Sequence, residues 1–165
     1  MAAVMLFLLY SVIFSFSDQD AEQSGSLSYL ISEKCVEFIN VLSGKQWTLM
    51  FQQKMTAYFE NPIRKLAHFA EYAFMGVLVY NVWRPWRNRD RKLYILVVVW
   101  VFLSAAGDEF HQLFVPGRHG CFADVLLDTC GGVFGVLCCV LVEKLFKRYC
   151  NAKARRDRIR KKNPT

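Results

Sequence analysis

Long apolar blocks, rather than a repeating amphipathic pattern, dominate this chain of 165 residues. Four blocks either lack charged side chains or carry them only near their ends: residues 2–16, 66–83, 93–107 and 122–146. A helix that crosses a bilayer needs about 20 predominantly apolar residues, within a range of roughly 17–25. The second and fourth blocks meet that length, and the first and third approach it when weakly polar neighbours are added. We therefore predict an all-α, polytopic membrane protein with about four transmembrane helices.

The first block could also act as a secretory signal sequence, which would be cleaved. It lacks a positively charged start, however, and the following "FSFSDQD" offers no small-x-small cleavage site. We therefore expect this first helix to be retained.

Charged residues outside the blocks predict which way the helices point. Residues 17–61 contain six acids and three lysines, whereas residues 84–92 contain five basic residues and one acid. The segment from Glu143 onward has ten basic residues and two acids. Lys and Arg collect on the cytoplasmic side of membrane proteins. We therefore place residues 84–92 and both termini in the cytoplasm, and residues 17–61 and 107–122 on the outer side of the cell membrane.

The outer segment before the second block is polar and partly helical in pattern. "SDQDAEQSGSLS" is typical of a linker, and "YLISEKCVEFINVL" spaces its apolar residues like an amphipathic helix on a membrane surface. A second short helix is expected through "WTLMFQQKMTAYF". Pro62 suits the first turn of the next helix, with Asn61 as its cap. Cys35 and Cys121 fall in loops on this side, and their spacing leaves open whether they pair.

The basic tail, "KRYCNAKARRDRIRKK", follows the last block directly. Anionic lipid headgroups attract such a segment by about 1 kcal/mol per basic residue. We therefore expect membrane lipids as its partner and no nucleic acid. The expected divisions of the chain are a first transmembrane helix (1–17), an extracytoplasmic loop with short helices (18–61), a three-helix membrane core (62–146) and a basic cytoplasmic tail (147–165).

Helical spacing decides which polar residues within the apolar blocks can meet. Residues three or four apart lie on the same face of a helix, so each of the last three helices has one polar face. The first face holds Lys65, His68, Tyr72 and Gly76, with Glu71 beside them; the second holds Phe102, Ala105, Glu109 and Gln112, with Asp108 beside them; the third holds Asp124, Asp128, Gly131, Gly135 and Cys139.

The predicted topology brings the polar parts of these faces to one depth near the outer boundary. The second helix enters at Lys65, the third leaves at Glu109, and the fourth re-enters at Asp124. The connecting turn "VPGRHG" carries Arg118. A charge in the apolar region is costly unless it is paired or faces a wet cavity. We therefore expect one shared cluster, in which Arg118 pairs with Glu109 or Asp124.

These residues resemble the VanZ-like family of bacterial membrane proteins. "KLAHFAEYAFMGVL" and "DEFHQLFVPGRHGCFADVLLDTCGGVFGVL" are similar to its pattern of K-x-x-H-x-x-x-Y, then E-x-x-Q with P-G-R, then D-x-x-x-N-x-x-G-x-x-x-G. "IFSFSDQD…QSGSLS" also resembles the family's Ser-rich exit from its first helix. The resemblance covers about residues 10–145 and implies a cell-envelope protein related to one that confers low-level resistance to the antibiotic teicoplanin.

The resemblance also implies roles for the matched positions, which are Lys65, His68, Tyr72, Glu109, Gln112, Pro116, Arg118, Asp124, Gly132 and Gly135. The family more often has Asn at the position of Asp128, so the role of that Asn is not transferred. The binding residues that we predict are Lys65, His68, Tyr72, Glu109, Gln112, Arg118, Asp124 and Asp128.

Two readings of this cluster remain open. In the first, paired charges lock the helices together and present a polar pocket to a lipid headgroup, a lipid-linked precursor or a glycan. In the second, the cluster is catalytic: His68 is a general base, and Glu109 and Asp124 are further candidates. Arg118 with Lys65 would then hold a phosphate or carboxylate of a lipid or lipid-linked substrate.

Other functions find less support in the residues. His68-x-x-Glu71 and Glu109-x-His111 supply metal-ligand types, but the repeat that a di-iron bundle needs is missing, so we expect no metal and no cofactor. Proton-coupled transport is disfavoured because no internal repeat is visible. Gly131-x-x-x-Gly135 permits close packing inside the bundle or against another copy, which leaves the oligomeric state open.

Overall fold

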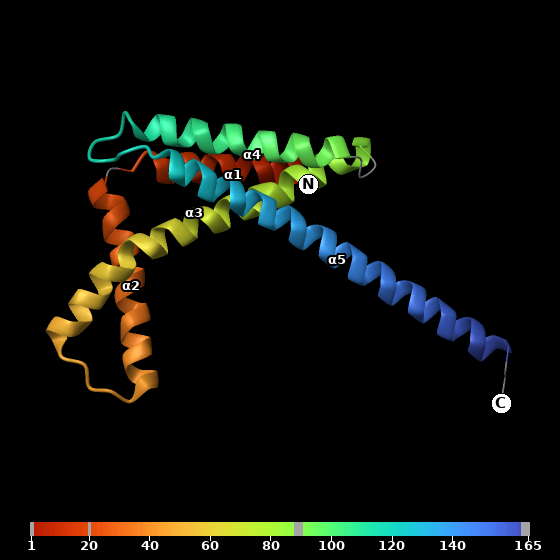
Figure 1. Cartoon of the computed structure of the whole chain (residues 1–165), viewed down its shortest axis with the longest axis horizontal. Helices are drawn as coiled ribbons and strands as arrows, with labels where there is room; N and C mark the ends of the chain where they lie inside the picture. Colours follow the sequence, from red (N-terminus) through yellow and green to blue (C-terminus); the bar gives the residue numbers. More distant parts are fainter. Residues whose placement is uncertain (1, 20, 88–90, 163–165) are drawn as a thin grey trace.

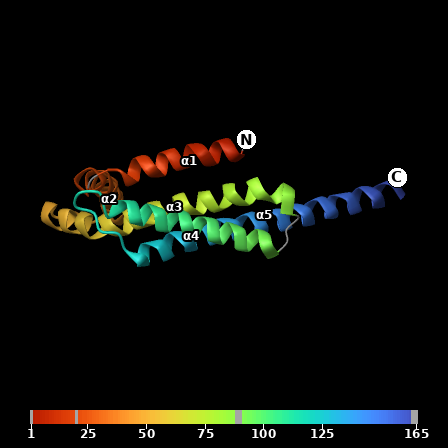
Figure 2. The ribbon, with the colours of Figure 1, turned by 90° about the horizontal axis from the view of Figure 1, so that it is seen from above.

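The computed structural model describes residues 2–19, 21–87 and 91–162, and within these ranges the chain forms five α-helices and no strand. In chain order the helices are α1 (Ala2–Ser17), α2 (Ala21–Ser43), α3 (Leu49–Arg87), α4 (Arg91–Gln112) and α5 (Phe122–Lys162). The predicted all-α class is confirmed. α1, the second half of α3, α4 and the first half of α5 form a bundle, and α2 with the first half of α3 forms a hairpin at one end (Figure 1, Figure 2).

The bundle is apolar both inside and outside. Its core is made of buried residues from α1, α3, α4 and α5, including Ile13, Tyr72, Met75, Val97 and Val136. Large apolar side chains also cover the outer surface of α1, α4 and α5, where many are more than half exposed. A water-soluble monomer rarely exposes apolar patches of this extent. A lipid-facing helix presents such side chains without that penalty, because lipid tails are as apolar as the side chains themselves.

Two of the described helices are long and apolar enough to cross a membrane, namely α4 and residues Phe122–Arg156 of α5. The apolar blocks predict four membrane-spanning helices, so two of the four meet this test among the described residues. α1 is apolar but only 16 residues long. The apolar part of α3 contains His68, Glu71 and Asn81. These polar side chains lower its mean hydropathy, so α3 is not among the helices that meet the test.

Glycines let α3 and α5 approach each other backbone to backbone. A Cβ atom added at Gly131 would lie 2.4 Å from the carbonyl oxygen of Phe69, and one added at Gly135 would lie 2.0 Å from that of Ala73. No side chain fits at such distances. Of the two packing partners considered for the Gly131/Gly135 face, the structure places the face inside the bundle, against α3.

One end of the bundle gathers most of the helix termini and is called the polar end here. α1 and α4 finish at this end, and α2 and α5 begin there, whereas α3 finishes and α4 begins at the opposite end (Figure 1, Figure 2). An ion pair joins α3 to α5 at each end. Lys65 pairs with Asp124 at the polar end, and Arg84 pairs with Glu143 at the opposite end.

α1 is attached to the bundle through α4 as well as through apolar contacts. The indole Nε1 of Trp100 donates a hydrogen bond to the hydroxyl of Tyr10 at 2.8 Å, and the Tyr10 hydroxyl also contacts Ser104. Near the polar end the ring of Phe14 lies 4.9 Å from that of His111, measured between centroids. α1 therefore belongs to the folded bundle.

Two helix boundaries between residues 17 and 62 differ from the prediction. α2 begins at Ala21, so "SDQDAEQSGSLS" is mostly helix and not a linker. Its serines satisfy their hydroxyls locally, since Ser28 donates to the carbonyl of Gly25 and Ser32 donates to that of Ser28. Gly25 faces α3, where an added Cβ atom would make ordinary contact, at 3.4 Å, with Glu60 Oε1. Packing against α3 thus outweighs the weak helix propensity of Ser and Gly.

The predicted break before Pro62 is wrong. The expected short helix and the second apolar block form one helix, α3, with Pro62 in its interior and Asn61 inside the helix instead of capping it. An interior proline removes one backbone hydrogen bond and commonly kinks a helix without ending it. The expected division at residue 61/62 therefore falls within a continuous helix that joins the hairpin to the bundle.

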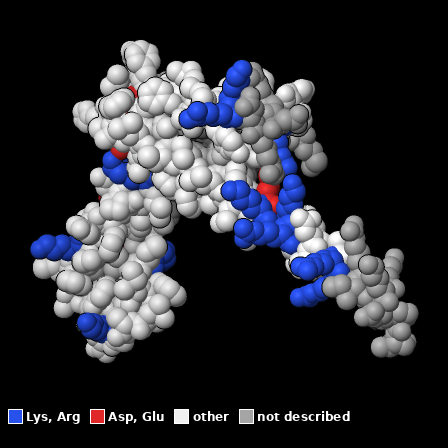
Figure 3. All heavy atoms as spheres, turned by 45° about the vertical axis from the view of Figure 1, so that its right-hand side comes forward, with Lys and Arg blue, Asp and Glu red and all other residues white. Residues whose placement is uncertain are grey.

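α5 continues beyond the bundle as a helix. It leaves the other helices after its first half and extends to Lys162 (Figure 1). Lys and Arg side chains gather along this extension (Figure 3). The basic tail is thus a helical continuation of the last apolar helix.

Candidate polar pocket

A pocket with a volume of about 160 Å³ opens at the polar end, between α3, the end of α4, the α4–α5 turn and the start of α5. Its walls come from residues that are far apart in the sequence. The lining residues are Asn61, Arg64, Lys65, His68, Glu109, Gln112, Gly117, Arg118, His119, Asp124, Leu127 and Asp128. Seven of the eight predicted binding residues therefore lie around one pocket.

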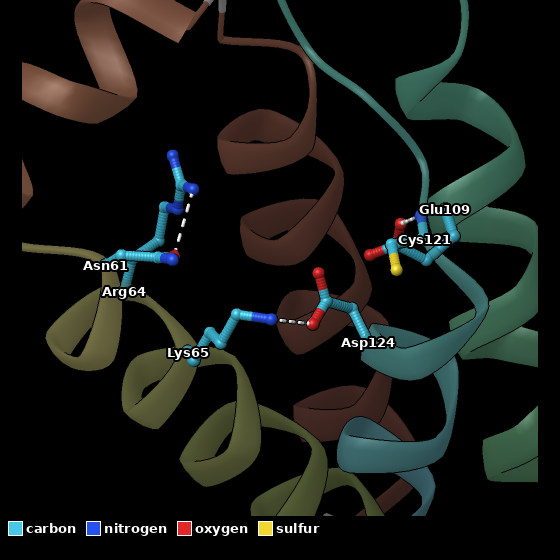
Figure 4. A network of polar contacts seen from close by, with 6 residues as sticks. All are labelled: Asn61, Arg64, Lys65, Glu109, Cys121 and Asp124. Atoms are coloured by element: carbon cyan, nitrogen blue, oxygen red, sulfur yellow. Dashed lines mark hydrogen bonds and ion pairs between the residues drawn. The ribbon is translucent and has the colours of Figure 1, made fainter.

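Lys65 and Asp124 form an ion pair across the pocket, from α3 to α5 (Figure 4). Asp124 lies in the first turn of α5, where a carboxylate is also favoured by the unpaired backbone N–H groups of the helix start. The side chains of Lys65 and Asp124 are 41% and 29% exposed, so the pair is open to the pocket. Asp124 therefore forms an ion pair with Lys65. From the sequence, Arg118 was one expected partner of Asp124.

Glu109 holds the turn between α4 and α5 in place. Its Oε2 accepts a hydrogen bond of 2.7 Å from the backbone N–H of Cys121 (Figure 4). Gly120 lies so close that an added Cβ atom would be 2.4 Å from the carbonyl oxygen of Glu109. One turn further, Gln112 donates from Nε2 to Asp108 Oδ2 at 3.1 Å. The end of α4 thus fixes the residue before α5 through the buried side chain of Glu109, whereas the bond between Gln112 and Asp108 lies within α4.

Two arginines reach the pocket from different segments. Arg118, in the α4–α5 turn, donates from Nη2 to the backbone carbonyl of Phe16 at 3.1 Å, which ties the turn to the end of α1. Arg64, on α3, donates from Nη2 to Oδ1 of Asn61 at 3.2 Å (Figure 4). The expected pairing of Arg118 with Glu109 or Asp124 stays a prediction, although all three residues line the pocket.

His68 and Asp128 are the more deeply placed polar groups of the pocket. Nδ1 of His68 lies 3.8 Å from Glu71 Oε2, which is too far for a hydrogen bond but close enough for attraction when the imidazole is protonated. Asp128 is 1% exposed, and its Oδ1 has no hydrogen-bond partner among the described residues. A buried acceptor without a donor is costly, and this oxygen is covered by neighbouring atoms, so a ligand would reach it only if a lining side chain moved.

Tyr72 is the predicted binding residue that the structure does not bring to this pocket. It is buried in the core, and its side chain lines a different pocket with Tyr10, Ser104 and Asp108, between α1, α3 and α4. Tyr72 occupies the same face of α3 as Lys65 and His68 but lies one turn further from the polar end.

The sequence reasoning missed several lining residues, namely Arg64, Gly117, His119 and Leu127, and it interpreted Asn61 as a helix cap. A signal was present for part of this set. Asn61 lies four residues before Lys65, so it extends the polar face of α3 backwards by one turn. The expected helix start at Pro62 concealed this extension.

The described part of the chain contains neither a cluster of metal-ligand side chains nor a disulfide bond. No group of three or more His, Cys, Asp or Glu side chains there is arranged to hold a metal ion. Cys35 and Cys121, whose pairing was open, are both exposed free thiols.

The fold and the pocket together define a class of protein: an all-helical bundle with lipid-compatible surfaces and a charged pocket at one end. A family model described as VanZ/LLP1 matches residues 2–143, and the chain belongs to this family. The resemblance inferred from the motifs is thereby confirmed. Comparison with curated proteins and with solved structures gave no match. Family membership and the two long apolar helices identify a VanZ-like membrane protein of the cell envelope.

Proposed function

We propose that the protein spans the bacterial cell membrane four times and binds the polar group of an envelope component in the polar pocket, at the outer surface. Binding there would lower the susceptibility of the cell to glycopeptides such as teicoplanin. The observation that carries the proposal is the convergence of Lys65, Glu109, Arg118 and Asp124, from three helices and the α4–α5 turn, on one pocket.

Four spans are supported by the arrangement of the helices. α1 and residues 66–83 of α3 lie beside α4 and α5 in one bundle, although they are shorter or less apolar than these two helices. Bundle packing shields part of their polar surface from lipid, so composition alone underestimates their ability to span. The basic segments 84–92 and 143–162 then belong on the cytoplasmic side, together with both termini.

Binding, rather than closure of the bundle alone, is supported by the state of the pocket. If the charges served only to join helices, we would expect mutual pairing with no space between them. The pocket instead has a volume of about 160 Å³, and its lining includes charged side chains from α3, α4 and α5.

The test is the response of a teicoplanin-susceptible bacterium that expresses the protein. We expect the wild-type chain to raise the inhibitory concentration of teicoplanin and Arg118→Ala to abolish the increase. Arg156→Ala is the matched control, because Arg156 is an exposed arginine on the extension of α5. Immunoblots of membranes must show that the variants accumulate equally. Wild-type resistance with Arg118→Ala at normal protein level would refute the proposal.

An enzymatic function is the second candidate, because His68 faces the pocket and has Glu71 as a carboxylate neighbour. The protein would then modify a lipid headgroup or a lipid-linked precursor, with His68 as general base and Glu109 or Asp124 assisting. His68→Gln keeps a polar side chain but removes the base. Loss of the phenotype with unchanged ligand binding would favour catalysis, whereas a retained phenotype would eliminate His68 as the base.

A further inference from the structure

A second pocket adjoins the polar pocket and is of opposite character. It has a volume of about 190 Å³ and lies between the end of α1, the first half of α2 and the middle of α3. Its walls are mainly apolar, and we call it the apolar pocket. The lining residues are Phe16, Gln19, Leu27, Ser28, Ile31, Ile63, Arg64, Ala67, His68, Glu71 and Arg118.

The two pockets meet at three shared residues: Arg64, His68 and Arg118 line both of them. These three side chains therefore lie at the boundary between the polar and the apolar lining, and two of them carry guanidinium groups. An arrangement of a charged compartment beside an apolar one matches a molecule that has a charged head and a hydrocarbon chain.

The charge of Arg64 is available to an anion. Its hydrogen bond goes to the neutral amide oxygen of Asn61, and no ion pair to its guanidinium is found among the described residues. Guanidinium groups bind phosphate oxygens through paired, charge-assisted hydrogen bonds. Arg64 also lies near the middle of α3 (Leu49–Arg87), and α3 passes from the hairpin into the bundle about halfway along its length (Figure 1). In the proposed topology this point is the level of lipid phosphates.

We propose that the two pockets form one binding site for a membrane phospholipid. Its phosphate lies at the junction between Arg64 and Arg118, its headgroup enters the polar pocket, and one acyl chain lies in the apolar pocket against Ile31 and Ala67. The proposal rests on the proposed function and specifies its ligand. A phospholipid is favoured over rarer lipids because it surrounds the bundle at this depth at the highest concentration.

Titration of the purified full-length chain with dioleoylphosphatidylglycerol in detergent, followed by native mass spectrometry, tests the proposal. Dioleoylglycerol, which has the chains without the phosphate, is the comparison lipid. We expect the wild-type chain to bind the phospholipid at least roughly tenfold more tightly, since a charge-assisted contact contributes enough free energy for a factor of that size. Equal affinity for the two lipids would overturn the role of the phosphate.

Two variants test the two halves of the site separately. Arg64→Gln removes the charge, and Ala67→Phe fills the apolar pocket from an exposed helix position. Their controls are Lys54→Gln and Ala57→Phe, which change exposed residues on the same helix that line neither pocket. We expect each test variant to weaken phospholipid binding roughly tenfold and each control to leave binding unchanged, with equal melting temperatures as evidence of folding.

The outcomes separate this inference from the proposed function. Unchanged phospholipid binding by Ala67→Phe and Arg64→Gln would overturn the lipid site, even if Arg118→Ala still abolished the teicoplanin phenotype. Binding of undecaprenyl phosphate without binding of the phospholipid would also overturn it, while leaving an envelope ligand in the polar pocket.

Discussion

Substitution of Gly135 by alanine tests whether the close approach of α3 and α5 sets the geometry of the bundle. The added Cβ atom would lie 2.0 Å from the carbonyl oxygen of Ala73, whereas ordinary contact begins at 3.4 Å. The two helices would have to separate by about 1.4 Å along this line, which is the difference between these distances. Backbone cannot rotate away as a side chain can, so the strain must be distributed over both helices.

The expected cost follows from two opposing contributions. Overpacking of a well-packed interior costs about 1–3 kcal/mol, and a clash with backbone belongs at the upper end of that range. Alanine in place of glycine favours the helix by about 1 kcal/mol. We therefore expect Gly135→Ala to lower the free energy of unfolding by about 2 kcal/mol. For a chain of this length that corresponds to a melting temperature lower by about 4–8 °C.

Thermal unfolding of the detergent-solubilised chain, followed by intrinsic fluorescence, measures this effect. Gly107→Ala is the matched control, because Gly107 is exposed on α4 and an added Cβ atom would meet nothing within 4 Å. The control should keep only the gain in helix propensity and melt at the same temperature as wild type or slightly higher. Equal melting temperatures for Gly135→Ala and Gly107→Ala would refute the close packing of α3 against α5.

Three further predictions concern the ion pair, the topology and the attachment of α1. In a double-mutant cycle with Lys65→Met and Asp124→Asn, we expect a coupling energy of about 1 kcal/mol, because the pair is partly exposed; additive effects on unfolding would contradict the pair. In intact cells, a membrane-impermeant maleimide should label Cys121 in a single-cysteine variant but should label Cys150 only after permeabilisation; the reverse would invert the proposed topology. Tyr10→Phe removes the hydrogen bonds of α1 to α4 and should destabilise the chain by about 1 kcal/mol in chemical unfolding, whereas unchanged stability would show that apolar contacts alone hold α1.

The polar faces were predictable from spacing, and their convergence was predictable from the topology. Lys65, Glu109 and Asp124 come from different helices, yet all three line the pocket. The inference was possible because charges that are costly in an apolar environment must share a common polar site. Whether this site binds the proposed ligand stays a prediction that the experiments above address.

The helix boundaries were less predictable, and each error has a physical reason. Pro62 was expected to begin a helix, but packing of the first half of α3 on α2 supports the helix on both sides of the proline. The Ser-rich segment before Tyr29 was expected to be a linker, but its hydroxyls bond to carbonyls within α2. At Pro62 a tertiary contact outweighed a local preference of a few kcal/mol, whereas in the Ser-rich segment hydrogen bonds within α2 accompany the helix that packs on α3.

The sequence by itself determined that the chain is helical, which segments are apolar, and which polar residues share a helical face. These properties depend on residues within a few turns of one another, and helical periodicity makes them visible in a single chain. Only the tertiary structure decided that Asp124 pairs with Lys65, that Tyr72 lies away from the pocket, and that the apolar pocket exists. These features depend on the rotation of each helix and on the docking of α2 against α3. Both are set by contacts between segments far apart in the sequence, such as the close approach at Gly135, which no local pattern records.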